Sequence, residues 1–466
     1  MSKDGKRLSH YRNNNYRDNF SLIIIYGRRR VGKTELIKEF CKRTSHMYHL
    51  VSQESAMTQQ EKFIEELAAH SGDRVPRIED WHDAIDYLGE VLSDGKEFVA
   101  IDEFPYLVES SDTILSALQH FIDTMSDDVT STLVLCGSSI SVMESEVLGH
   151  ESPLYGRRTA QIDLQPFSFA DALDVIDYPF EESVRSFAVT GGMPMYLMLF
   201  DYDQPLETNV LNNHLSKTSI LYNEPEFLLR TELRSPSRYM SILEAIANGY
   251  TTPNEISGQT AIDSGPLSGY LTRLRRLRLI EREVPVTARE KKSKRSVYRI
   301  ADDFLRFWFR FVEPNRSGTE QAPQFVLEER IVPELNRFVS KTFEDICQEL
   351  LWRLVTTDQL KCSCDAIGRW WHGEHEIDIV GLDDRTPAAV FGECKWTNTP
   401  VGMSLVEKLR EKSDEVRWKR NDRDEEYILF SKSGFDKTLD ETLDDRWHLY
   451  DLERIARVFD SSKPTV

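Results

Sequence analysis

A short apolar run followed at once by a glycine-rich loop is the feature that most constrains this chain. Leu22–Ile25 are four consecutive apolar residues, and the sequence then reads GRRRVGKT from Gly27 to Thr34. These eight residues fit the pattern G-x-x-x-x-G-K-[ST] without a mismatch, and Glu35–Phe40 continues with helical character. The order of strand, loop and helix is the context that this pattern requires. It predicts an α/β domain built around the loop.

The loop predicts phosphate binding. Glycines let backbone N–H groups wrap around phosphates, and the N-terminus of the following helix adds a partial positive charge. Lys33 is expected to contact the β- and γ-phosphates, and the Thr34 hydroxyl is expected to bind Mg²⁺. The alternative is a glycine turn that matches the pattern by chance. The candidate nucleotide-contacting residues of this segment are Gly27, Arg28, Arg29, Arg30, Val31, Gly32, Lys33, Thr34 and Glu35.

A second apolar strand ends in two acidic residues. Phe98–Ile101 is apolar, and Asp102 and Glu103 follow it directly. We expect Asp102 to hold Mg²⁺ through water and Glu103 to orient or deprotonate the water that attacks the γ-phosphate. The alternative is a strand that ends in a solvated acidic turn. With the loop upstream, the pair favours a site for ATP and Mg²⁺ that hydrolyses ATP.

Two later segments supply further candidates for this site. Thr132–Cys136 is a third expected strand, and Ser138 after it is a candidate sensor of the γ-phosphate, with a simple turn as the alternative. Arg157 and Arg158 form a pair downstream. Arg157 is a candidate for supplying positive charge to the transferring phosphate, with a surface salt bridge as the alternative.

Composition excludes some classes of protein. The chain has 466 residues, of which 40% are hydrophobic, so it is long enough for about three domains with real cores. No apolar run approaches the roughly 18 residues of a membrane span, and no apolar signal-peptide core follows the polar segment Met1–Asn19. Six cysteines are too few for a disulfide framework and are expected to be reduced thiols. We therefore expect a cytoplasmic protein without a membrane partner.

The charge is distributed unevenly along the chain. The formal net charge of −20 disfavours uniform binding to nucleic acid. Residues 266–300 nevertheless contain eleven Lys or Arg and three Glu, a local balance of +8, so the remaining residues sum to −28. Such a basic segment in an acidic protein indicates a local contact with DNA.

Three expected helices are followed by a hairpin, and the basic segment spans the third helix and the hairpin. Tyr239–Asn248 is the first helix, and Thr252 followed by Pro253 marks the start of the second. Ser268–Leu279 is the third, and a charged loop (Arg289–Arg295) precedes a return strand. In the third helix leucines are expected to face inward, while arginines cover the other side: Leu271, Leu274 and Leu277 against Arg273, Arg275, Arg276 and Arg278.

This order is that of a winged helix. It favours DNA contact, with the third helix in the major groove and the wing on phosphate. The alternative is a winged helix that docks proteins or regulates the ATPase.

The C-terminal part predicts a second α/β domain. Its expected elements are a helix (Phe338–Leu354), three strands (Ala366–Trp371, Glu376–Val380, Ala388–Trp396), a helix (Val401–Lys412) and two strands (Tyr427–Ser431, Trp447–Leu452). This order, with an acid on the second strand and E-x-K on the third, resembles the PD-(D/E)xK nuclease fold.

A metal-dependent nuclease site is the functional interpretation of this domain. Residues two apart on a strand share a face, so Glu393 and Lys395 point the same way, and Asp378 can join them across the hairpin. Two carboxylates can hold Mg²⁺ and the lysine can activate water, with Glu344 completing the set of metal ligands. The alternative is a nuclease-like fold with an ion pair in its sheet and no cleavage.

Five segments together resemble one family: Gly27–Thr34, Ile101–Pro105, Cys136–Ser139, Tyr155–Arg158 and Gly191–Pro194. They are similar to the archaeal ATPase family, a group of AAA-like, STAND-class P-loop ATPases. The resemblance implies ATP binding, slow hydrolysis, and a P-loop core followed by a helical lid, a winged helix and a C-terminal domain of unknown function. One departure is that Met1–Asn19 lacks the Arg-Glu-x-Glu-Leu box that helps the family hold adenine. Either the start is truncated or base recognition is altered.

These observations predict a multidomain α/β protein. The expected parts are a P-loop ATPase core (1–165), a helical lid (166–232), a winged helix (233–318) and a restriction-endonuclease-like domain (319–466). The expected function is an ATPase whose nucleotide state regulates a DNA-binding or DNA-cleaving module. The alternative is a signalling ATPase whose last two domains dock proteins. The candidate partners are ATP, DNA through residues 266–300, a second copy of the chain and another protein.

Overall fold

The computed structural model describes residues 20–42, 45–93, 97–125, 129–233, 235–288, 293 and 295–461. Contacts divide the chain into two compact units. The first unit runs to Pro166 and includes Met193–Met195, and the second unit contains Phe167–Gly192 and the chain from Tyr196 onward. The first unit ends one residue after the expected ATPase core, and the expected division of the second unit into three domains stays a prediction. The missing adenine box concerns residues that lie outside the described ones.

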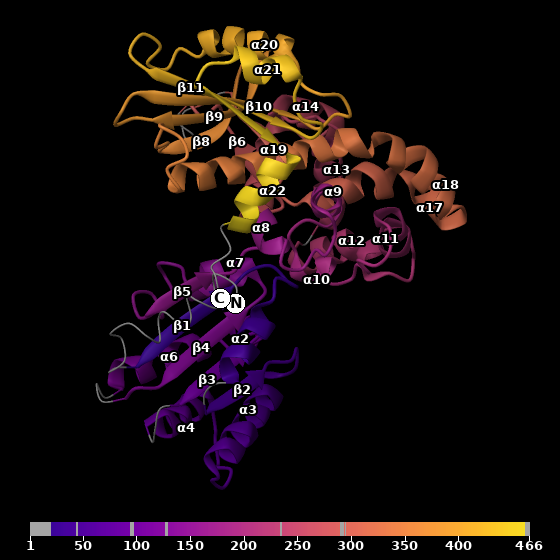
Figure 1. The fold of residues 1–466 in the computed structure, drawn as a ribbon. Helices are drawn as coiled ribbons and strands as arrows, with labels where there is room; N and C mark the ends of the chain where they lie inside the picture. The colour runs from indigo at the N-terminus through magenta and orange to yellow at the C-terminus, as the bar shows by residue number, and fades with distance from the viewer. Residues whose placement is uncertain are drawn as a thin grey trace. The chain divides into compact units, whose positions relative to one another are not determined.

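The first unit is built on a parallel sheet with the order β2-β3-β4-β1-β5 (Figure 1). Because β4 lies between β1 and β3, the strand that leads into the glycine-rich loop and the strand that ends in the two acids are not neighbours. Its strands are β1 (Ser21–Tyr26), β2 (His46–Leu50), β3 (Phe98–Asp102), β4 (Thr132–Gly137) and β5 (Ala160–Asp163).

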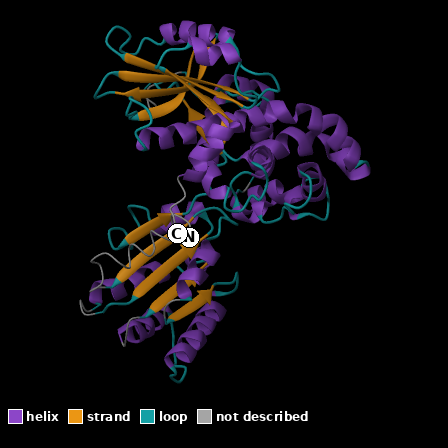
Figure 2. Cartoon of the chain, viewed as in Figure 1, coloured by secondary structure: helices purple, strands orange, loops and turns teal. Residues whose placement is uncertain are grey.

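Helices cover both faces of this sheet (Figure 2). In β1, Leu22 and Ile24 belong to the core that includes residues of α3, α4 and α6, while Ile23 and Ile25 pack with α2 on the other face. A strand that is buried on both faces reads as a continuous apolar run, which explains the sequence of β1. The helices are α2 (Lys33–Cys41), α3 (Ala56–Ser71), α4 (Trp81–Ser93), α5 (Pro105–Ser110), α6 (Ile114–Thr124), α7 (Ile140–Val142) and the π-helix η1 (Met143–Val147).

The second unit begins with short helices. Glycine is needed at position 192, because a Cβ there would lie 1.9 Å from the carbonyl oxygen of Phe167. The Phe167 N–H donates to Gly192 O at 2.7 Å. The helices are α8 (Phe169–Ala172), α9 (Phe180–Thr190), α10 (Pro194–Leu197, which starts in the first unit), α11 (Leu206–Asn213) and α12 (Ile220–Glu232).

Three helices and a two-stranded antiparallel sheet follow, in the order expected from the sequence. They are α13 (Pro236–Ala247), α14 (Pro253–Thr260), α15 (Ser264–Arg276), β6 (Ile280–Glu283) and β7 (Val297–Ile300). Thr252 caps α14 and Pro253 lies in its first turn, as predicted, and Glu255 completes a capping box with Thr252. Leu271, Leu274 and Leu277 are buried, also as predicted. Of the charged loop between β6 and β7, residues 289–292 and 294 lie outside the described residues.

A run of aromatic residues then leads into a long helix. Phe304, Phe307, Trp308, Phe309 and Phe311 are all buried and pack in the core of the second unit. The elements are α16 (Asp303–Phe307), η3 (Trp308–Val312), η4 (Glu313–Asn315), α17 (Arg316–Gln321), α18 (Pro323–Val326), η5 (Leu327–Ile331) and α19 (Val332–Thr356).

The C-terminal sheet has the order β12-β11-β10-β9-β8. Strands β8, β9 and β10 are antiparallel, whereas β10, β11 and β12 are parallel, and α20 connects the parallel pair β10 and β11. Val406 and Leu409 of α20 pack against this sheet, and α19 contacts β8, β9 and β10. The elements are β8 (Ala366–His372), β9 (His375–Asp383), β10 (Ala388–Lys395), α20 (Met403–Glu415), β11 (Asp424–Ser431), α21 (Lys437–Thr442), β12 (Trp447–Asp451) and α22 (Leu452–Ser461).

None of the helices in the described parts of the chain is both long and apolar enough to cross a membrane. All six cysteines are buried free thiols.

Candidate functional site

The glycine-rich loop has the backbone that its sequence demands. Gly27, Arg30 and Gly32 have φ angles of 154°, 68° and 96°, in the region that favours glycine. A Cβ on Gly27 would also lie 2.4 Å from the carbonyl oxygen of Leu164. Gly32 caps α2, so the loop ends at the N-terminus of a helix, where anions bind well.

Lys33 is buried at the start of α2 and folds back over the loop. Its Nζ atom donates to the carbonyl oxygens of Gly27 at 3.0 Å and Arg28 at 2.9 Å. Burial lowers the pKa of the Lys33 ammonium. The nearby carboxylates of Asp102 and Glu103 oppose this shift. The ammonium thus lies inside the loop that the sequence assigns to phosphate.

Asp102 is surrounded by three hydrogen-bond donors. Its Oδ2 atom accepts from Thr34 Oγ1 at 2.6 Å and from the hydroxyl of Tyr48 at 2.9 Å, and its Oδ1 atom accepts from the Glu103 N–H at 2.9 Å. Burial raises the pKa of Tyr48, and the charge of Asp102 raises it further, so the phenol stays a donor. A hydroxyl and a carboxylate in contact are oxygen ligands of the kind that Mg²⁺ takes. Thr34 and Asp102 therefore fit a Mg²⁺ ion.

Glu103 has an unusual backbone conformation and a partner from the neighbouring strand. Its φ of 55° is uncommon for a residue other than glycine, and such conformations concentrate at functional sites. Its Oε1 atom accepts from Ser138 Oγ at 2.8 Å. Gly137 lets the end of β4 lie close to Pro105, because a Cβ there would lie 2.6 Å from the Pro105 ring.

A second cluster of charged side chains lies in the C-terminal sheet. Lys395 Nζ is 2.8 Å from Glu393 Oε2 and 3.6 Å from Asp378 Oδ2, so the three residues of the proposed nuclease motif converge. Lys412 of α20 lies 2.5 Å from the other oxygen of Glu393, and the Cys394 N–H donates to Asp378 Oδ2 at 2.9 Å. Burial raises the pKa of Glu393, and the charge of Asp378 adds to this effect. Burial by itself would lower the pKa of Lys395, but the two carboxylates outweigh it and raise that pKa.

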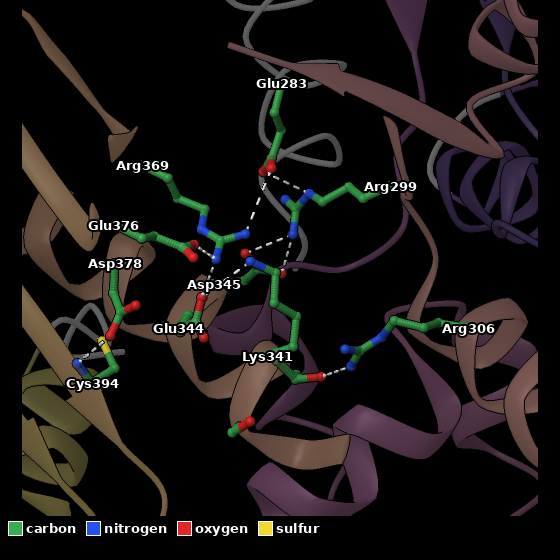
Figure 3. Close-up of polar contacts among 12 residues, drawn as sticks. Glu283, Arg299, Arg306, Lys341, Glu344, Asp345, Arg369, Glu376, Asp378 and Cys394 are labelled. Atoms are coloured by element: carbon green, nitrogen blue, oxygen red, sulfur yellow. Dashed lines mark hydrogen bonds and ion pairs between the residues drawn. The ribbon is translucent and has the colours of Figure 1, made fainter. Parts of the chain in front are cut away.

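Glu344 of α19 belongs to a neighbouring network (Figure 3). Its Oε2 atom is 3.0 Å from Lys341 Nζ and 3.2 Å from Arg369, which also pairs with Glu376. Burial, followed by the charge of Asp378, raises the pKa of Glu344 well above its usual value. Figure 3 shows Arg369 between these carboxylates, and it links them to Glu283 of β6 at 3.7 Å.

This cluster does not fit the metal that the nuclease interpretation requires. Glu393 is only 2% exposed, and each of its oxygens is paired with an ammonium group. Glu344 is likewise paired with two cations. Within the described ranges, no three His, Cys, Asp or Glu side chains are grouped so that they could hold a metal ion. The side chains converge as predicted, but lysine ammonium groups, instead of a metal ion, pair with the carboxylates.

Part of the basic segment is also engaged in ion pairs. Arg299 of β7 pairs with Glu281 and Glu283 and with Asp345 of α19, at 2.6 Å for the last (Figure 3). Arg295 donates to the carbonyl oxygen of Trp371 at 3.3 Å. Asp345, outside the segment, neutralises part of the Arg299 charge, so the balance of +8 overstates the charge that this segment offers to DNA.

Comparisons with known proteins bear on both units. Residues 7–200 match a family described as an ATPase domain predominantly from Archaea, and residues 308–425 match one described as archaeal and bacterial proteins of unknown function. An uncharacterized protein of Methanocaldococcus jannaschii is 33% identical over 390 residues, which cover 81% of this chain and 83% of that protein. The chain belongs to the archaeal ATPase family. The resemblance inferred from the five sequence segments is thereby confirmed.

Solved structures similar to this archaeal ATPase are more distant. A Walker-type ATPase of Pyrococcus abyssi is 21% identical, with a TM-score of 0.48, and the match covers 66% of this chain and 95% of that one. The ORC2 protein of Aeropyrum pernix is 14% identical, with a TM-score of 0.42, over 69% of this chain and 94% of that one.

Two candidate residues of the ATPase lie away from the cluster around Asp102. Arg157 precedes β5, at the end of the parallel sheet opposite to the loop, and its guanidinium is held by both oxygens of Asp123 at 2.6 and 2.7 Å. This contact is the surface salt bridge that was the alternative to phosphate contact by Arg157. Within one chain, Arg157 does not reach the phosphate loop. The carboxylate of Glu35 pairs with exposed Lys38 at 3.3 Å and takes no part in the cluster.

Nucleotide contact by the other residues of the loop stays a prediction. Arg28 and Val31 are buried, and Arg29 donates to the Tyr106 hydroxyl at 3.4 Å. Two contacts of candidate site residues were missed by sequence reasoning. Tyr48 has no motif around it, and its only signal is its place on the strand that pairs with β3. Lys412 lies on the predicted amphipathic helix, and only its contact with Glu393 sets it apart.

Proposed function

We propose that this archaeal ATPase uses its nucleotide state to control DNA binding by its second unit. The proposed ATP hydrolysis is supported by one cluster of side chains. In it, Thr34 contacts Asp102 at 2.6 Å and Ser138 contacts Glu103 at 2.8 Å. These contacts join a metal-ligand pair to a general base beside the phosphate loop. ATPases of this type need both.

In the proposed reaction the groups of this chain divide the work. The Lys33 ammonium exchanges the loop carbonyls for the β- and γ-phosphates, and Thr34 and Asp102 hold Mg²⁺. When bound, Mg²⁺ neutralises charge on the phosphates. Glu103 accepts a proton from the attacking water, and Ser138 holds the Glu103 carboxylate in position.

The DNA-binding half rests on α15. Its leucines are buried, and its basic residues cluster in the last turn of the helix, with Arg275 exposed. A helix with a cationic outer face, followed by a two-stranded sheet, supports phosphate contact.

Replacement of both Arg275 and Arg276 by alanine is expected to weaken binding to duplex DNA at all sequences. Each lost phosphate contact should lower the slope of log K against log salt by about 1. Fluorescence anisotropy with ATP or ADP at several salt concentrations measures this slope, and Arg457→Ala, at an exposed position of α22, is the control. DNA binding that is identical in the double variant, or that ignores the nucleotide, would favour the protein-docking alternative.

DNA cleavage is the second candidate, favoured by the convergence of Asp378, Glu393 and Lys395. Cleavage would require the lysine ammonium groups to leave Glu393 before a metal could bind, so we expect no Mg²⁺-dependent cleavage. Plasmid and linear DNA incubated with Mg²⁺ test this, with Asp378→Ala as the matched variant. Cleavage by the wild type that disappears in Asp378→Ala would contradict our expectation and establish a nuclease.

A further inference from the structure

Tyr48 is the side chain at the nucleotide site that no motif predicts. Its hydroxyl and that of Thr34 donate to the same oxygen of Asp102, at 2.9 and 2.6 Å. The other oxygen of Asp102 accepts the Glu103 N–H at 2.9 Å. Three groups therefore hold the Asp102 carboxylate: the Tyr48 hydroxyl, the Glu103 N–H and the Thr34 hydroxyl. Of these, the Thr34 hydroxyl would also bind Mg²⁺.

The ring of Tyr48 is fixed by the fold. Tyr48 lies on β2, in register with Ala100 of β3, two residues before Asp102. Its ring packs with Leu36 and Phe40 of α2 against the core on that face of the sheet. A donor whose ring is held by packing can orient its acceptor, because little rotational freedom is left to either group.

Hydrogen bonds to a carboxylate are directional and stronger than those between neutral groups. Without the Tyr48 hydroxyl, Asp102 Oδ2 would lose one of its two hydroxyl donors and keep the Thr34 hydroxyl, which is also the expected Mg²⁺ ligand. The orientation of Asp102 would then depend on Thr34, the residue together with which Asp102 is expected to hold Mg²⁺.

We propose that Tyr48 is a positioning residue that holds Asp102 ready for the nucleotide-bound Mg²⁺ ion. This inference rests on the proposed ATP site and adds to it the residue that sets its metal dependence. Tyr48 acts through Asp102 and does not touch the phosphates. Removing its hydroxyl should weaken the contribution of Mg²⁺ to nucleotide binding and leave metal-free binding as it is.

Tyr48→Phe tests the proposal because it removes one oxygen and keeps the ring in the core. Binding of a fluorescent ATP analogue to the full chain is measured in Mg²⁺ and again in EDTA. We expect affinity in Mg²⁺ to fall about tenfold or more, the size of one charge-assisted hydrogen bond, with no change in EDTA. The Mg²⁺ concentration for half-maximal ATP hydrolysis should rise in parallel.

Tyr87→Phe is the matched control. Its hydroxyl contacts Ser71 at 3.1 Å and Asp73 at 3.3 Å on α3, α4 and the turn between them. This variant should bind the nucleotide like the wild type in both buffers. Equal losses for Tyr48→Phe in Mg²⁺ and in EDTA would indicate a merely structural role, and unchanged affinity in both would also overturn the proposal. A wild-type chain that binds no nucleotide in either buffer would instead contradict the proposed ATP site.

Discussion

Replacement of Lys33 by alanine is expected to lower kcat for ATP hydrolysis by about 100-fold or more. The Lys33 ammonium is the one lysine of the described phosphate loop, and it is buried against the loop carbonyls at 2.9 and 3.0 Å. Charge that develops on a transferring phosphoryl group is stabilised strongly by a cation that is already in place. Phosphate release at saturating ATP and Mg²⁺ measures the effect.

Lys38→Ala is the control for this experiment. Lys38 lies on the same helix, but it is exposed and pairs with Glu35 at 3.3 Å. An exposed ion pair contributes little to stability, so we expect this variant to hydrolyse ATP like the wild type. Hydrolysis that is unchanged in Lys33→Ala would refute the assignment of the loop.

Replacement of Glu103 by glutamine is expected to separate ATP binding from hydrolysis. Glutamine keeps an oxygen that can accept from Ser138 Oγ but cannot take a proton from water. General-base catalysis typically contributes about 100- to 10,000-fold, so hydrolysis should fall by that order while ATP binding persists. Nucleotide binding by equilibrium titration and phosphate release under the same conditions show both effects.

Glu109→Gln provides the matched control for Glu103→Gln. Glu109 is exposed on α5, a few residues further along the chain, and removal of its charge leaves Asp102 and Ser138 untouched. A Glu103→Gln variant that still turns over ATP at the wild-type rate would show that another group activates the water. Loss of binding together with hydrolysis would indicate that the Glu103 carboxylate is also needed to bind the nucleotide.

Most elements could be predicted from the sequence because their signals are local. The apolar run of β1 and the Thr252 cap with Pro253 each depend on residues a few positions apart. The same holds for the phosphate loop, whose glycines adopt backbone angles that other residues rarely adopt. The convergence of Glu393 with Lys395 follows from the two-residue period of a strand.

The partners of the functional side chains could not be predicted in this way. Ser138 meets Glu103 over 35 residues and Tyr48 meets Asp102 over 54, and both contacts depend on the order of strands in the sheet. Arg157 looked like a phosphate contact because its sequence is basic, yet the direction of β5 places it at the opposite end. Arg299 and the cluster around Glu393 looked available for DNA and for a metal until their ion pairs were known.

The sequence by itself determined that this archaeal ATPase has a phosphate loop, because eight contiguous residues specify that backbone and its lysine. The tertiary structure alone decided how the loop is completed. Strand β4 lies between β1 and β3, and it brings Ser138 to Glu103, while β2 brings Tyr48 to Asp102. A motif records what the backbone must do locally. The packing of the sheet determines which distant side chain forms a hydrogen bond with a buried carboxylate.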